Sequence, residues 1–162
     1  MNHITIIAGA RPNFMKIAPI IHEIIRNKKA GINIDYSLVH TGQHYDSKMS
    51  DIFFKDLEID EPEYHFNING KSHGQMTGEM LSSIEEVLIK ERPNACLVYG
   101  DTNSTLAGAL AASKLHIPVI HVEAGLRSFN KLMPEEINRI LTDHLSNYLF
   151  CSTEMAVKNL LN

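Results

Sequence analysis

Short apolar runs alternate with longer amphipathic stretches along most of this chain, and that alternation constrains the fold more than any other feature. The runs, each bounded by turn residues, lie at 4–8, 34–40, 95–99, 119–122 and 148–151. Strands buried on both faces form continuous apolar runs, and intervening helices are typical of parallel crossovers. We therefore predict a single α/β domain over residues 1–162, a three-layer αβα sandwich with a parallel sheet in the middle.

The amphipathic stretches predict the helices of this sandwich. Their expected limits are about 11–28, 46–57, 72–90, 103–115, 134–145 and 153–162. Pro19 must lie near the first turn of its helix or bend it. The stretch 103–115 is rich in Ala and Gly, which lets a helix lie close on a sheet. Residues 58–70 are irregular, with a short strand expected at 65–68.

Charge and hydropathy exclude two broad classes of partner. With a formal net charge of -4 and a pI near 6.1, the chain lacks the clustered basic charge of nucleic-acid-binding domains. It has no run of 18 apolar residues and no signal peptide, so we expect a cytoplasmic protein without membrane contact. Cys96 and Cys151 lie in apolar segments without CxxC spacing, which predicts buried thiols, no disulfide framework and no metal site.

Two cations flank the start of the first predicted helix, in the segment GARPNFMK at residues 9–16. This segment matches neither GxGxxG nor GxxxxGK(S/T), so neither the dinucleotide nor the P-loop fingerprint is present. Arg11 and Lys16 nevertheless lie beside a helix N-terminus, where free N–H groups and the helix dipole favour an anion. A phosphate or diphosphate is the natural ligand, and two solvated side chains on a surface turn are the alternative.

Carboxylates follow the later strands of the predicted sheet. Asp101 comes directly after the run 95–99, where capping of the next helix is the simpler interpretation. Glu123 follows another apolar strand and cannot be deeply buried without a partner, and Arg127 is the predicted partner. Because ligands bind beyond the carboxyl ends of parallel strands, these two acids are expected to face one site.

Two more carboxylates, Glu135 and Glu136, lie in the first turn of the helix that begins at Pro134. The helix dipole alone would favour them there. If they meet the acids that follow the strands, the cluster has the groups that proton transfer requires.

The loop after the second strand, HTGQHYD at residues 40–46, adds His40, Gln43 and His44 as candidate ligand-binding side chains. Histidines at helical positions, such as His22 and His144, are more simply packing or surface residues. No pair has HExxH spacing, so the sequence offers no support for metal ligation.

Five segments of the chain form one recognisable set. They are GARP at 9–12 with Lys16, TGQH at 41–44, GDT at 100–102, HVEAGLR at 121–127 and PEExxR at 134–139. Taken together, these segments closely resemble the non-hydrolysing UDP-N-acetylglucosamine 2-epimerases. They occur in the order of that family and with similar spacing, and the resemblance covers essentially all 162 residues. HVEAGLR combined with PEExxR is the most specific part of the match.

The resemblance implies a Rossmann-like fold, the N-terminal half of a two-domain architecture of glycosyltransferase-B type with the active site between the domains. The second domain is absent from these 162 residues, and members of the family are usually homodimers. In this family UDP is eliminated across C1 and C2 of the sugar and added back, which interconverts UDP-N-acetylglucosamine and UDP-N-acetylmannosamine. The reaction uses no nicotinamide or other cofactor.

The resemblance also implies roles for individual residues. The catalytic carboxylates, without assigned acid and base roles, correspond to Asp101, Glu123 and Glu135. The contacts to UDP phosphates correspond to Arg11, Lys16 and Arg139. The contacts to a regulatory UDP-N-acetylglucosamine or to substrate correspond to Gln43, His44, Arg127 and Glu136. The chain has QHYD at 43–46 where many bacterial members have QHR followed by Gln or Glu, which indicates another subgroup or a modified sugar.

Other interpretations stay open at this level. The chain could be a 2-epimerase for an oxidised or diacetamido UDP-sugar, a hydrolysing relative, or a non-catalytic interaction domain or split subunit. A glycosyltransferase fragment would share the fold but is not expected to carry both HVEAGLR and PEExxR. The helix at 153–162 ends without a Gly cap or a polar tail, which suggests a truncated chain. Because the resemblance places the UDP-binding wall on the second domain, we expect this chain to have little activity of its own.

Overall fold

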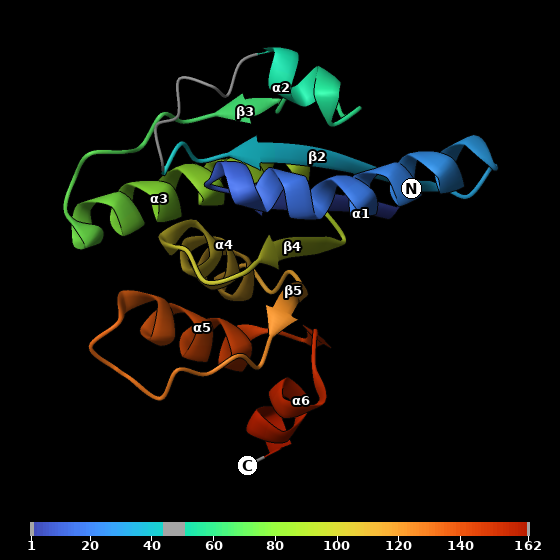
Figure 1. Cartoon of the computed structure of the whole chain (residues 1–162). Helices are drawn as coiled ribbons and strands as arrows, with labels where there is room; N and C mark the ends of the chain where they lie inside the picture. Colours follow the sequence, from blue (N-terminus) through green and yellow to red (C-terminus); the bar gives the residue numbers. More distant parts are fainter. Residues whose placement is uncertain (1, 44–50, 162) are drawn as a thin grey trace.

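The computed structural model describes residues 2–43 and 51–161, and its centre is a parallel β-sheet (Figure 1). Within the described residues this sheet has six strands in the order β3-β2-β1-β4-β5-β6, with every neighbouring pair parallel. The strands are β1 Asn2–Ala8, β2 Ile34–His40, β3 Tyr64–His65, β4 Ala95–Tyr99, β5 Val119–Ala124 and β6 Tyr148–Cys151. This is the strand order of the doubly wound Rossmann fold, which confirms the predicted αβα sandwich.

Helices connect the strands and follow the amphipathic pattern of the sequence. They are α1 Arg11–Lys29, α2 Asp51–Asp56, α3 His73–Glu91, α4 Asn103–Lys114, α5 Pro134–Leu145 and α6 Glu154–Leu161. Pro19 lies in the interior of α1, and the helix continues on both sides of it. The helix expected at 46–57 is described from Asp51 onward, and residues 46–50 lie outside the described part. The strand expected at 65–68 is the shorter β3, one position earlier.

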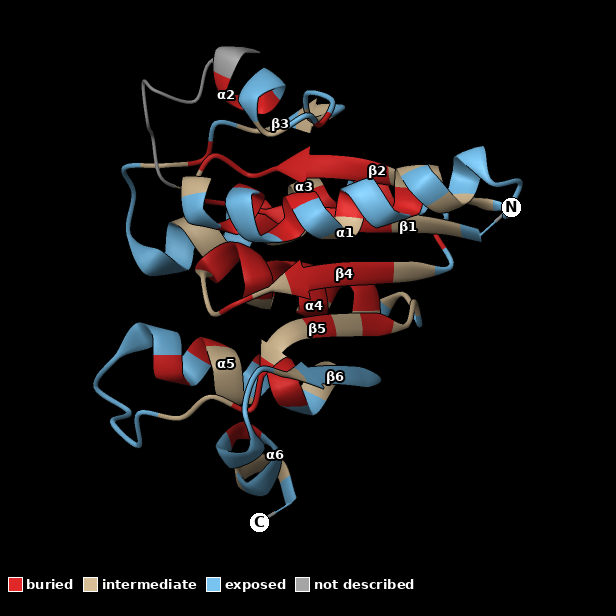
Figure 2. Cartoon of the chain, turned by 45° about the vertical axis from the view of Figure 1, so that its right-hand side comes forward, coloured by how far each residue is buried: buried red, intermediate tan, exposed pale blue. Residues whose placement is uncertain are grey.

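The two faces of the sheet carry separate apolar cores because successive side chains of a strand point to opposite sides. On β1, Ile6 packs in the core beneath α1, whereas Ile7 packs in the core beneath α3 and α4. Figure 2 shows α1 in front of the sheet and α4 behind it. The small residues of α4 allow close packing, since a Cβ on Gly108 would lie 3.0 Å from Val98 and 3.2 Å from Ile7.

Burial falls toward β6, one of the two edge strands of the described sheet, and β6 and α6 are largely pale blue in Figure 2. Cys96, in the central strand β4, is fully buried as predicted, and burial raises the pKa of its thiol to about 12. Cys151, in β6, is only partly buried, so the prediction of a second core thiol was wrong. None of the helices in the described ranges is long and apolar enough to cross a membrane.

Candidate active site

A pocket of about 620 Å³ lies at the carboxyl ends of the strands, where the sequence predicts a site. The side of the pocket formed by α1 and the loops after β2 and β4 includes Ala10, Arg11, Pro12, Asn13, Lys16, Gln43, Gly100, Asp101, Thr102 and Asn103. The rest of the lining is His73, Met76, Glu123, Glu135 and Asn138. The fold therefore brings together the three predicted carboxylates, the two predicted cations of α1 and Gln43. His44 lies outside the described residues.

The first turn of α1 forms the cationic end of the pocket. Asn13 accepts a hydrogen bond from the backbone N–H of Ala10 at 3.1 Å and so helps to cap the helix. The guanidinium of Arg11 lies over the Phe53 ring, 5.0 Å from its centroid. Lys16 donates to both carboxylate oxygens of Glu123, and this hydrogen bond raises the pKa of Lys16. Cationic side chains beside a helix N-terminus are what an anionic ligand would require, and the phosphate site expected here stays a prediction.

Glu123 lies in an irregular part of β5. The register of β5 against β6 shifts at this point, and Glu123 has a left-handed backbone with φ of 75°. Its partner is Lys16, so the prediction that Arg127 pairs with Glu123 was wrong. Arg127 instead donates to Asp143 at 2.6 Å. The bulge explains the difference, because it turns Glu123 to the pocket while the next residues leave the strand.

Asp101 is held by a side chain from α5 rather than by a helix N-terminus. Thr102 caps α4, so the simpler interpretation of Asp101 as the cap was wrong. Arg139 donates to Asp101 with one nitrogen and to Glu136, at 2.9 Å, with another. Arg139 itself does not line the pocket, and its predicted contact with UDP phosphates stays a prediction.

Glu136 is buried and holds the loop that precedes α5. Its carboxylate accepts the backbone N–H groups of Ser128 and Phe129, both at 2.9 Å, in addition to Arg139. Burial opposes ionisation, but these hydrogen bonds prevail and keep the pKa of Glu136 below its usual value. Its predicted part in regulation stays a prediction, and within residues 2–43 and 51–161 its side-chain hydrogen bonds go to the loop and to α5.

Asn138 and Asn103 line the pocket but were not predicted as site residues, and Gln43 was predicted for another role. Asn138 donates to the backbone carbonyl of Asp101 at 2.9 Å and to the side chain of Asn103 at 3.1 Å. The side-chain oxygen of Gln43 accepts the N–H of Ser104 at 2.9 Å, at the start of α4. Asn138 lies inside PEExxR, one position before Arg139, and that placement was the available sequence signal.

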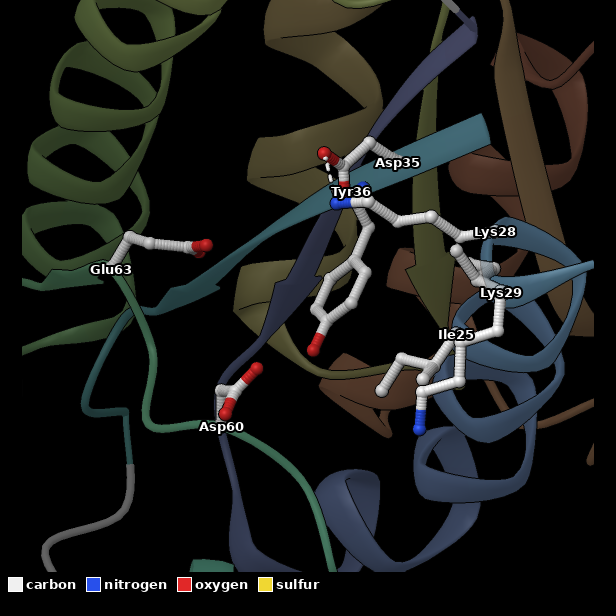
Figure 3. Close-up of a pocket in the computed structure, with 8 residues that line it drawn as sticks. Ile25, Lys28, Lys29, Asp35, Tyr36, Asp60 and Glu63 are labelled. Carbon is white, nitrogen blue, oxygen red and sulfur yellow. Dashed lines mark hydrogen bonds and ion pairs between the residues drawn. The ribbon is translucent and has the colours of Figure 1, made fainter. Parts of the chain in front are cut away.

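A second hollow, of about 590 Å³, lies at the other end of the sheet, near the start of β2 (Figure 3). There Lys28 pairs with Asp35 at 2.7 Å. The hydroxyl of Tyr36 points toward Asp60 in Figure 3 and has no hydrogen-bond partner in the described part of the chain. Burial and the charge of Asp60 raise the pKa of Tyr36 to about 12. Among the residues that the structure describes, none of the predicted site residues lines this hollow.

The strand order and the pocket beyond the strand ends define a doubly wound α/β domain, with cationic side chains at the start of α1 and carboxylates facing one pocket. In comparisons with known proteins, residues 26–162 match the family model for UDP-N-acetylglucosamine 2-epimerase. The chain belongs to that family. Across residues 2–43 and 51–161, no group of three or more His, Cys, Asp or Glu side chains is arranged to hold a metal ion.

Close relatives carry epimerase names. The chain is 58% identical over 162 residues to the UDP-2,3-diacetamido-2,3-dideoxy-D-glucuronate 2-epimerase of Pseudomonas aeruginosa, all of this chain and 44% of that one. It is 59% identical to a UDP-N-acetylglucosamine 2-epimerase homolog of Methanococcus maripaludis, over 98% of this chain and 43% of that one. The crystal structure of Methanocaldococcus jannaschii UDP-GlcNAc 2-epimerase in complex with UDP-GlcNAc and UDP has a TM-score of 0.91 at 53% identity, over 98% of this chain and 42% of that one. The chain thus spans less than half the length of these relatives.

Proposed function

We propose that this chain forms one wall of the active site of a UDP-N-acetylglucosamine 2-epimerase, the wall that carries the catalytic carboxylates. The observation that carries the proposal is one pocket lined by Asp101, Glu123, Glu135, Arg11 and Lys16. The three carboxylates can exchange protons with a sugar, and the two cations can bind a diphosphate. A nucleotide-sugar carries a sugar and a diphosphate in one molecule, so these two parts match the acidic and the cationic ends of the pocket.

In the proposed reaction a carboxylate removes the proton from C2 of the sugar, and the electron pair of that C–H bond forms a C1–C2 double bond. The C1–O bond breaks at the same time, and its electron pair leaves on the UDP oxygen. The products are free UDP and a sugar with a C1–C2 double bond. Addition of the UDP oxygen to C1 and of a proton to the other face of C2 then gives the epimer, without an oxidant or a reductant. Lys16, Arg11 and the N-terminus of α1 stabilise the negative charge that develops on the departing diphosphate.

We further propose that the active site is a cleft between this domain and a second one, in a protein that forms homodimers. The support for a second domain is that the chain spans only 42% to 44% of its relatives, and we expect the wall opposite the carboxylates in the part that it does not cover. We expect the 162-residue chain alone to fold and to turn over little substrate, because catalysis by positioning needs both walls.

A chimera tests this function directly. Residues 1–162 replace the corresponding segment of the Methanocaldococcus jannaschii enzyme, and NMR follows interconversion of UDP-N-acetylglucosamine and UDP-N-acetylmannosamine. We expect turnover by the chimera, a loss of about 100-fold or more in its E123Q variant, and little turnover by the chain alone. A folded chimera without turnover, beside an active parent enzyme, would contradict the proposal.

A second candidate substrate follows from the Pseudomonas aeruginosa relative, whose name specifies a diacetamido glucuronate attached to UDP. That sugar differs from N-acetylglucosamine at C3 and C6, whereas the proposed chemistry at C1 and C2 is the same. Supplying both UDP-sugars to a chimera built on the Pseudomonas enzyme separates the candidates. Turnover of the diacetamido glucuronate alone would assign this chain to the second substrate.

A further inference from the structure

Asp143, on α5, is a buried carboxylate that collects donors from β5 and the loop after it. It lies within 2.7 Å of Nδ1 of His121 and 2.6 Å of a guanidinium nitrogen of Arg127. It also accepts the backbone N–H of Gly125, with the nearer oxygen at 3.2 Å. Only 5% of Asp143 is exposed, so this carboxylate does not itself reach substrate in the pocket. Its effect must pass through the groups that it holds.

Glu123 lies midway in the sequence between two of these donors, His121 and Gly125. Its φ of 75° is a left-handed backbone conformation that residues other than Gly and Asn seldom adopt, and this conformation costs free energy. Such a conformation persists only when its surroundings determine it. Here the residue two positions before, His121, and the residue two positions after, Gly125, are both hydrogen-bonded to Asp143. The same carboxylate therefore fixes the strained backbone from both sides.

The His121 ring extends this link to the neighbouring strand. The ring is fully buried, and its Nε2 donates to the backbone carbonyl of Gly100 at 2.8 Å. Gly100 directly precedes Asp101, the second carboxylate of the pocket. Through its two nitrogens the ring ties the loops after β4 and β5 to α5.

We propose that Asp143 is a positioning residue for the epimerase reaction, which holds Glu123 in its left-handed conformation and, through His121, fixes the loop of Asp101. The catalytic consequence rests on the proposed function. Loss of the hydrogen bonds that join Asp143 to His121 and Gly125 lets the backbone of Glu123 relax toward an extended conformation, which turns its carboxylate away from the pocket. A misplacement of about 1 Å at a reacting group costs about 100-fold in rate, whereas nucleotide binding at α1 depends less on Glu123.

The first experiment uses the chain itself. D143N keeps the size of the side chain but replaces one accepting oxygen with a donor. T142V is the matched control, because Thr142 is the preceding residue of α5, is equally buried and has a hydroxyl without a hydrogen-bond partner among the described residues. Three-bond HN–Hα couplings and Cα shifts of Glu123 report φ. We expect left-handed values in the wild type and T142V, and a shift toward extended values in D143N.

The second experiment measures kinetics of the same variants in the active chimera. We expect D143N to lower kcat about 10-fold to 100-fold with KM changed less than about threefold, and T142V to match the wild type. A merely structural role would lower the amount of folded protein without this split between kcat and KM. A folded D143N with wild-type kcat, or with left-handed values at Glu123, overturns the proposal.

Should D143N fail to fold, H121N carries the test with the same readouts. It breaks the link between Gly100 and Asp143 but leaves Gly125 and Arg127 on the carboxylate. A wild-type chimera without turnover would remove the proposed function. The couplings measured on the chain alone would then still decide whether Asp143 holds Glu123.

Discussion

Lys16 and Glu123 are 107 residues apart in the sequence, yet the ammonium of Lys16 lies 3.0 and 3.2 Å from the two carboxylate oxygens of Glu123. Lys16 comes from the first turns of α1, and Glu123 comes from the bulge of β5. This contact joins the cationic end of the pocket to its acidic end. Both side chains are partly exposed, so the pair is placed to serve ligand chemistry more than stability.

Replacing Lys16 with Met is therefore expected to affect activity far more than folding. We expect kcat/KM of the chimera to fall more than about 10-fold, because a cation at the diphosphate is lost, while the free energy of unfolding changes less than about 1 kcal/mol. K28M is the matched control, since Lys28 pairs with Asp35 at similar exposure but far from the pocket. Equal kinetic losses in K16M and K28M would contradict the assigned place of Lys16.

The left-handed backbone of Glu123 predicts an unusual order of stability among substitutions. We expect E123G to be more stable than E123A by about 1 kcal/mol, because Gly adopts φ of 75° without strain. In E85G and E85A, on the exposed face of α3, the order should reverse by about 1 kcal/mol. Urea unfolding of the four variants measures these differences in the free energy of unfolding. If E123A were more stable than E123G, as E85A is expected to be relative to E85G, strain at Glu123 would be excluded.

His40 predicts a loss of stability in acid. It is buried at the end of β2 with Nε2 unpaired among the described residues, and burial lowers its pKa to about 4 from 6.5. The unfolded chain therefore binds more protons below pH 6.5, and stability falls as the pH falls toward 4. We expect His40 to account for about 2 kcal/mol between pH 7 and pH 5.

Urea unfolding at these two pH values measures the effect. H40Q should reduce the pH dependence by that amount, because the titrating group is gone. H22Q, which replaces an exposed histidine of α1, should keep it. An unchanged pH dependence in H40Q would show that His40 is not the group responsible.

Arg139 bridges Asp101 and buried Glu136, so its removal leaves two carboxylates without their common cation. We expect R139M to lower the free energy of unfolding by about 3 kcal/mol, because Glu136 stays buried and charged. R26M, which breaks an exposed pair with Glu23, should cost less than about 0.5 kcal/mol. Thermal and urea unfolding compare the two variants, and equal costs would place Arg139 outside any buried network.

Much of the fold could be predicted from local pattern. The apolar runs became strands, and the helix that begins at Pro134 starts and ends where the sequence indicates. Periodicity determines these elements because each one buries its own apolar face. The pocket residues Asp101 and Glu123 were also predicted, since the carboxyl ends of parallel strands meet at one edge of the sheet. Glu135, in the first turn of α5, was expected there from the family resemblance.

The sequence by itself determined the element order, the family and the set of charged residues at the site. Only the tertiary structure decided which charges pair: Lys16 with Glu123, Arg127 with Asp143, and Arg139 with Asp101. Neighbours in the sequence were the natural guess, as for Arg127 and Glu123. The bulge of β5 separates that pair, and a backbone turn of one residue leaves no signature in composition or periodicity. Which charges pair therefore depends on where the strands, loops and helices place their side chains, and only the folded domain determines those positions.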